Sequence, residues 1–297
     1  MREAVSTELG RPCRTAPVCR VLGIPRSTLY ARRKRAVGRR PSVRRGPKTT
    51  YTDAELTDRI RRVLAASPFT GEGHRKAWAR LRFEGIRTSR RRVLRLMREA
   101  NLLAPVRAQR ALGPRVHDGT IVTERPDLMW GADLTATVTV EDGQVAVFAA
   151  IDHCTAECVG IHAAKSATRF EALDPIRQGV RQRRGSYGQG AARDLRLRHD
   201  HGSQYTSDAF QEELRFLGIE SSPAFVRQPE GNGCIERFFR TLKEQLLWVR
   251  TFRNVEELRK ALHEWVRLYN EEWLIERHGF KSPAQMRREL LDKEAVA

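Results

Sequence analysis

The sequence predicts an α/β protein: a five-stranded mixed sheet with helices in its second half, preceded by all-α, strongly basic segments. Two observations support this. Hydrophobic residues recur at helical spacing between residues 52 and 100, whereas after Pro126 they alternate with a period of two. The charge is equally uneven, since residues 1–120 hold 30 Lys and Arg against 9 Asp and Glu, while residues 121–297 hold 25 against 27.

A one-sided basic excess is typical of proteins that bind a polyanion, and we expect nucleic acid. The chain of 297 residues has a formal net charge of +19. A disordered basic tail is the alternative, but it would not show helical periodicity. No apolar run is long enough to span a bilayer and no signal peptide opens the chain, so we expect a soluble cytoplasmic protein. Five cysteines without a CxxC pair indicate free thiols.

The basic half divides into two predicted DNA-binding domains, 1–50 and 51–120. Within the first, residues 17–30 have the outline of a short helix-turn-helix, and residues 31–50 look like a linker that lies along phosphates. The basic cluster at the start of this linker comprises Arg32, Arg33, Lys34 and Arg35.

Three helices are predicted in the second domain, at 52–65, 74–84 and 88–100. The last is amphipathic: Val93, Leu96, Met97 and Ala100 share one face, and Arg91, Arg92, Arg95 and Arg98 share the other. Arginine binds phosphate and guanine edges bidentately, so we expect the second face to contact DNA. An ordinary solvated helix would instead carry acidic partners, of which Glu99 is the one nearby.

The neutral half predicts a sheet domain at 121–275 and a helical tail at 276–297. In the first strand, 129–140, we expect the apolar parity from Trp130 to Val140 to be buried. The remaining predicted elements are strands at 144–152, 157–164, 195–200 and 219–222, helices at 168–183, 206–217, 232–248 and 254–270, and a last helix with Ser282 and Pro283 as its N-cap and first residue.

Three carboxylates stand where metal chemistry would need them. Asp133 lies on the polar parity of the first strand, Asp200 ends the fourth, and Glu236 begins a helix whose polar face also carries Arg240 and Lys243. Carboxylates that converge repel one another unless a cation is present, and oxygen ligands favour Mg²⁺ or Mn²⁺. Two such ions would catalyse a displacement at a phosphodiester.

Each of these positions also has a plainer interpretation. Glu236 and Arg240 could form an ordinary helix-stabilising pair. His199 and His201 have a spacing that suits zinc, but a third nitrogen or sulfur ligand is not nearby in the sequence. Asp152 ends the second strand much as Asp133 lies in the first, and we expect it to accept backbone hydrogen bonds in the turn that follows.

Taken together, these motifs resemble the DDE transposases of the retroviral-integrase superfamily, and more narrowly the second-reading-frame (OrfB) products of IS-three-type insertion sequences. The resemblance rests on Asp133, on RHDHGSQY around Asp200 and on GNGCIERFFRTLKEQL around Glu236. It extends to STLYARRKR, GHRKAWARLRFEGIRTSRRRVLRLMREANLLAP and YNEEWLIERHGFKSPAQMR. The resemblance implies an RNase H-like catalytic core in which Asp133, Asp200 and Glu236 bind two Mg²⁺ ions and Lys243 contacts the DNA end.

The resemblance also implies the reaction and its partners. The enzyme would cleave the terminal inverted repeats of its element and join the freed 3′-OH to target DNA through a circular intermediate. A homo-oligomer, a nucleoid location and a first-reading-frame partner are further implications. Of the family's Asp-Asn-Ala triplet before the glutamate, Asn232 alone is retained, as a DNA-contact candidate. The alternatives are an RNase H-like nuclease without strand transfer and a DNA-binding repressor derived from a decayed transposase.

Overall fold

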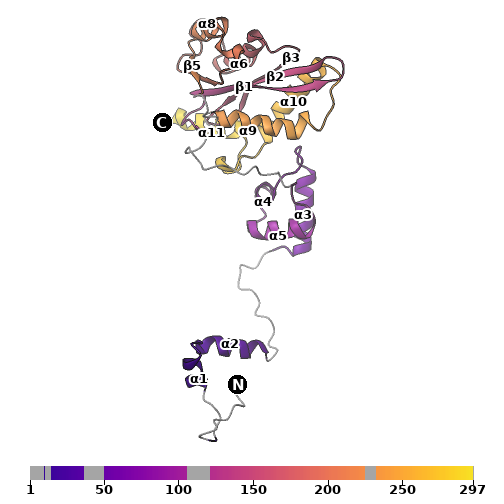
Figure 1. The fold of residues 1–297 in the computed structure, drawn as a ribbon, viewed down its shortest axis with the longest axis vertical. Helices are drawn as coiled ribbons and strands as arrows, with labels where there is room; N and C mark the ends of the chain where they lie inside the picture. The colour runs from indigo at the N-terminus through magenta and orange to yellow at the C-terminus, as the bar shows by residue number, and fades with distance from the viewer. Residues whose placement is uncertain (1–9, 11–14, 37–49, 106–120, 225–231, 297) are drawn as a thin grey trace. The chain divides into compact units, whose positions relative to one another are not determined.

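The computed structural model describes residue 10 and residues 15–36, 50–105, 121–224 and 232–296 (Figure 1). The chain forms two compact units, Met1–Thr50 and Tyr51–Ala297. Within the described ranges, no helix combines the length and the apolar character that crossing a bilayer requires. The four described cysteines are buried free thiols, and Cys13 lies outside the described residues.

The described part of the first unit contains two helices, α1 (Thr15–Val21) and α2 (Arg26–Ala36), joined by a turn in which Gly23 has a φ of +62°. This confirms the predicted helix-turn-helix outline. The predicted linker, however, begins too early, because α2 runs on to Ala36 and includes Arg32, Arg33 and Lys34. Ala, Arg and Lys are good helix formers even without an apolar period. The side chain of Arg35 lies outside the described part of the structure.

The second unit begins with the helices α3 (Asp53–Ala65), α4 (His74–Phe83) and α5 (Arg90–Glu99). Thr52 and Glu55 form a capping box at the start of α3, and Ser89 caps α5. The apolar faces of the three helices share one core, which includes Leu56, Ile60, Val63, Ala77, Leu81, Ile86, Val93, Leu96 and Met97. The predicted apolar face of α5 is thus confirmed for Val93, Leu96 and Met97, whereas Ala100 is the half-buried C-cap beyond the end of the helix.

A five-stranded mixed sheet follows, in the order β3-β2-β1-β4-β5. Its strands are β1 (Met129–Thr139), β2 (Gly143–Asp152), β3 (Cys158–Ala164), β4 (Arg196–His199) and β5 (Glu220–Pro223). The first three form an antiparallel meander, and β4 and β5 extend it in parallel with β1. The sequence predicted this five-stranded sheet and the order of its elements.

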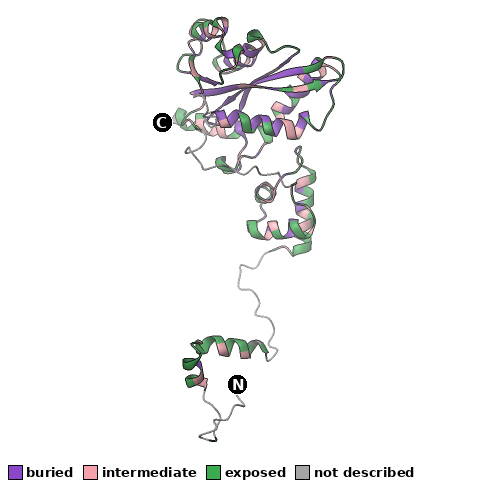
Figure 2. Ribbon diagram, viewed as in Figure 1, coloured by how far each residue is buried: buried purple, intermediate pink, exposed green. Residues whose placement is uncertain are grey.

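Helices cover both faces of the sheet, so its central strands are largely buried (Figure 2). One face packs against α6 (Arg169–Arg184) and α8 (Asp208–Leu217), the other against α9 (Gly233–Leu242) and α10 (Val255–Glu272). The short helix α7 (Ser203–Thr206) precedes α8, and the π-helix η2 (Lys243–Leu247) directly follows α9. The predicted single helix at 232–248 therefore changes its winding at Lys243.

The predicted burial of β1 is wrong in its second half. Val138 and Val140 are 68% and 71% exposed, whereas Thr139 is 2% exposed. The reason is that α6 and α8 pack against the other end of that face, around Trp130 and Ala132. At the far end, the segment at Phe252 pairs with Thr139 and covers the opposite face.

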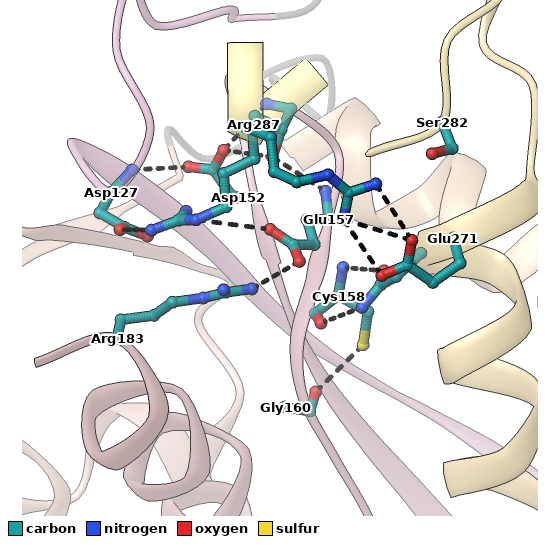
Figure 3. Close-up of polar contacts among 12 residues, drawn as sticks. Asp127, Asp152, Glu157, Cys158, Gly160, Arg183, Glu271, Ser282 and Arg287 are labelled. Carbon is teal, nitrogen blue, oxygen red and sulfur yellow. Dashed lines mark hydrogen bonds and ion pairs between the residues drawn. The ribbon is translucent and has the colours of Figure 1, made fainter. Parts of the chain in front are cut away.

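The chain ends in η3 (Glu276–His278) and α11 (Pro283–Val296). The backbone N–H of Gln285 donates to the Ser282 hydroxyl, which confirms the predicted N-cap of α11. From α11, Arg287 forms an ion pair with Asp127 and lies 3.8 Å from Glu157, which also pairs with Arg183 of α6 at 2.7 Å (Figure 3). This four-residue cluster is largely buried, with side chains 7–12% exposed, and joins the last helix to the start of β1 and to α6.

Candidate active site

Asp133 and Asp200 are brought together by the pairing of β1 and β4. Gly131 lies opposite Arg198 in this parallel pair. Asp133 and Asp200 each follow two residues later, so they lie at the same height along the two strand directions. Asp133 is half-buried, whereas Asp200 is exposed just beyond the end of β4. The Asp200 carboxylate accepts a hydrogen bond from the Gly202 N–H at 2.9 Å, which orients it in the turn.

Glu236 joins this site from the first turn of α9. A cavity of about 310 Å³ is lined by Asp133, Leu134, Thr135, Glu236, Phe239, Arg240, Lys243 and Trp248. The apolar stripe of α9, including Ile235, Phe238 and Leu242, is buried in the core and so turns the polar stripe toward this cavity. Two carboxylates and two cationic side chains therefore share one opening.

The start of α9 is tied to β1 by Asn232. This residue is buried, and its Nδ2 donates to the Ala132 carbonyl at 3.4 Å. A Cβ on Gly131 would lie only 2.9 Å from Asn232 Oδ1 and 2.8 Å from His153 Nε2, so this close approach requires glycine. The structure thus places Asn232 between the elements that carry Asp133 and Glu236, a role that the sequence did not suggest; Gly231 lies outside the described residues.

The three carboxylates influence one another electrostatically. Burial, the largest cause, together with the charges of Asp200 and Glu236, raises the pKa of Asp133 from 3.8 to about 6. Hydrogen bonding to the Leu134 N–H and the charge of Lys243 oppose this rise only in part. The site is therefore short of positive charge at neutral pH.

We predict that Asp133→Asn stabilises the metal-free protein at pH 7. The raised pKa means that above pH 6 the ionised Asp133 carboxylate is less favourable in the folded protein than in the unfolded chain. This lowers the free energy of unfolding by up to about 3 kcal/mol. This cost disappears as the pH falls below the unfolded pKa near 4, so the two proteins should then have equal stability. Denaturant unfolding in EDTA across this pH range measures the difference, and equal stability at pH 7 would contradict it.

The arginines of α5 differ in their surroundings. Arg92 and Arg95 donate to the Asp53 carboxylate of α3 at 2.8 and 2.6 Å, and Arg95 also pairs with Glu99. The expectation that Glu99 is the one acidic partner was wrong, because Asp53 is distant in sequence. Arg91 and Arg98 are exposed and have no ion pair within the described ranges.

Asp152, His199 and His201 are all held by protein atoms. Asp152 is fully buried and accepts hydrogen bonds from the N–H groups of Asp127 and Thr155, which confirms its predicted structural role. His199 bonds to the Asp200 carbonyl and to Ser221, and His201 bonds to the Ala224 carbonyl. Both ring nitrogens of His199 and the Nε2 of His201 thus have partners within the protein.

The three-helix domain rests on the segments that follow the active site. The Thr70 N–H and carbonyl both bond to the Gln245 side chain at 2.9 Å, within η2. Phe69 packs edge-on against Trp273 with ring centroids 4.8 Å apart, and Arg75 pairs with Glu276 at 2.7 Å. The basic domain therefore contacts the same turn that carries Lys243.

Comparisons with known proteins agree with this architecture. Models described as "Integrase core domain" match residues 123–229 and 217–283, and one described as "HTH-like domain" matches residues 51–110. The transposase of insertion sequence element IS629 from Shigella sonnei is 32% identical over 223 residues, 72% of each chain. Transposase InsD of insertion element IS2D from Escherichia coli is 27% identical over 252 residues, 83% of this chain and 82% of that protein.

Among solved structures, the HTLV-2 integrase catalytic core domain in complex with magnesium has a TM-score of 0.42 and 17% identity, and the match covers 55% of this chain and 98% of that one. The fold is the RNase H-like mixed sheet with an N-terminal helix-turn-helix region. The matched regions together span both the basic domain and the sheet domain. The chain belongs to the insertion-sequence transposases that carry an integrase core domain, a family of polynucleotidyl transferases that act on DNA.

Proposed function

We propose that Asp133, Asp200 and Glu236 form the catalytic triad of a DDE transposase and hold two Mg²⁺ or Mn²⁺ ions. The observation that carries this proposal is geometric: Asp133 and Glu236 line one cavity with Arg240 and Lys243, and Asp200 directly follows β4, which pairs with the strand that carries Asp133. The donors are all oxygens, which suits hard divalent cations. When bound, such ions neutralise charge on the attacking and leaving oxygens of a phosphodiester.

The chain's own residues would position the DNA. Asp133 lies in β1 and Asp200 directly follows β4, which pairs with β1, so the sheet brings the two residues close together. Asn232 holds the start of α9 and thereby Glu236. Lys243 and Arg240 line the same cavity, and their cationic side chains would hold the phosphates on either side of the reacting one.

The proposed reaction has two steps. Water first attacks the phosphodiester at an element end and releases a 3′-OH. That hydroxyl oxygen then attacks a target phosphorus, forming a new P–O bond as the bond to the target strand's own 3′ oxygen breaks. The bond count is conserved in the second step, which therefore needs no external energy source.

In this proposal the domain limits are 1–50, 51–120, 121–275 and 276–297, and the first two domains bind the terminal inverted repeats. A homo-oligomer would bring two element ends together, since symmetric assembly presents two identical end-binding surfaces. The first-reading-frame product is a proposed partner, as a further source of DNA-binding helices, and the cytoplasmic nucleoid is the proposed location.

The decisive experiment is a joining assay with a labelled duplex that carries the element's end and a target plasmid. We expect joined product with Mg²⁺ and none with EDTA. Cleavage without joining would instead identify an RNase H-like nuclease. Binding without cleavage, with the first-reading-frame product present, would identify a DNA-binding repressor.

We predict that Arg91→Ala and Arg98→Ala each weaken DNA binding and reduce the salt dependence of log K by about 0.9, as expected for one lost phosphate contact. Arg92→Ala should mainly destabilise the helical domain, because it removes a partner of Asp53. Salt-dependent fluorescence anisotropy combined with thermal unfolding separates these effects. An unchanged salt slope in both Arg91 and Arg98 variants would contradict the prediction.

A further inference from the structure

An exposed tryptophan stands at the edge of the active-site cavity. Trp248 is 70% exposed, although it is the largest apolar side chain type, and it lines the cavity together with Asp133, Glu236 and Lys243. Its backbone N–H donates to the Lys243 carbonyl at 2.9 Å, which closes the π-turn. Within the described residues, no other aromatic ring or cation is stacked on its indole.

The π-helix η2 is the reason that Trp248 faces this cavity. In an uninterrupted α-helix, a residue twelve positions after Glu236 would lie roughly 120° around the axis from it. One extra residue in the π-turn removes about 100° of this rotation and leaves roughly 20°. Trp248 therefore comes onto the Glu236 and Lys243 face, and Leu247, which would otherwise occupy it, is buried.

The surroundings of Trp248 match the chemistry of a nucleotide. Arg240 and Lys243 offer positive charge for a phosphate, and the indole offers a broad apolar face beside them. Nucleobases stack on exposed aromatic rings regardless of base identity, whereas protein–protein contacts prefer apolar neighbours around such a ring. The neighbours here are charged and include two carboxylates.

We propose that Trp248 is a stacking platform for one unpaired nucleobase next to the phosphate that reacts at the triad. This inference rests on the proposed function, since it places the reacting strand in the same cavity. A base can stack on the indole only if it has left its own duplex stack, so the site selects DNA that is opened at the reacting end. The base can come from the element's end or from the target strand.

The test is a thermodynamic cycle that compares the DNA affinities of the parent protein and Trp248→Ala, each measured on intact DNA and on DNA that lacks one base. Each protein carries Glu236→Gln, so that binding is measured without turnover, and single abasic sites are stepped through the last positions of the end duplex or of a target duplex. On intact DNA, we expect Trp248→Ala to weaken binding about tenfold. On DNA that lacks the stacked base, the same substitution should leave the affinity unchanged, because the stacking contact is already missing. The duplex in which this coupling occurs identifies the source of the base.

Two control variants define the result. Trp248→Phe should restore most of the affinity because it keeps an aromatic face, and Val249→Ala, which removes the neighbouring exposed side chain, should bind like the parent. Additive effects at every abasic position would overturn the stacking proposal. If Trp248→Ala and the missing base are coupled at one position, but the wild-type protein never joins DNA in the joining assay, the stacking proposal would stand and the proposed chemistry would be refuted.

Discussion

Glu236→Gln should lower both end cleavage and joining by about 10²–10³-fold or more, while binding to the element's end stays unchanged. The amide keeps the shape of the side chain but removes the negative charge that a divalent cation needs. Loss of one electrostatic group in an active site has effects of this size. Cleavage and joining of a labelled duplex, together with anisotropy on the same duplex, measure the two parts of this prediction.

Matched variants make the result specific. Glu212→Gln makes the same chemical change on the exposed surface of α8, and we expect wild-type activity. Asp133→Asn and Asp200→Asn should be as inactive as Glu236→Gln. Asp152→Asn should retain activity, because its carboxylate serves the turn at Thr155. An inactive but folded Asp152 variant, with an active Asp133 variant, would overturn the assignment of the triad.

Arg287→Ala should destabilise the second unit by about 3–5 kcal/mol, because it leaves the buried carboxylate of Asp127 without its main partner and removes a cation from beside Glu157. Burial by itself would raise the pKa of Asp127, but the hydrogen bonds and charge of Arg287 outweigh it and hold the pKa below 3.8. The stabilisation is therefore present above pH 4 and lost as the pH falls through this lowered value.

Arg288 supplies the control, since it is the next residue and pairs with Glu271 at 3.3 Å while 58% exposed. Arg288→Ala should cost less than about 1 kcal/mol. Denaturant unfolding at pH 7 measures both variants. Equal stability losses would show that the buried cluster does not hold α11 to the sheet.

Much of this organisation could be predicted from the sequence because it depends on local patterns. The alternation around Asp133 indicated the strand, the spacing of Val93, Leu96 and Met97 indicated α5, and Ser282 marked the start of α11. The grouping of Asp133, Asp200 and Glu236 also came from the residues and the family resemblance, and their roles remain a proposal.

Other features depend on contacts between distant segments, which no local pattern encodes. Asp53 of α3 pairs with Arg92 and Arg95 of α5, and Arg287 pairs with Asp127 across 160 residues. The burial of Thr139 instead of Val138 depends on the segment around Phe252, which arrives from elsewhere in the chain. The π-turn at Lys243 likewise leaves no mark in the hydrophobic spacing of the helix.

The hydrogen bonds between Thr70 and Gln245 join the three-helix domain to the turn that carries Lys243. If this domain binds the terminal repeat as proposed, the contact would fix the distance between the recognised sequence and the phosphate that is cut. A duplex advances about 3.4 Å with each base pair. One base pair inserted between the repeat and the cleavage point would thus move the original phosphate away from the carboxylates. Cleavage would then occur at the same distance from the repeat as before, whatever the base sequence there.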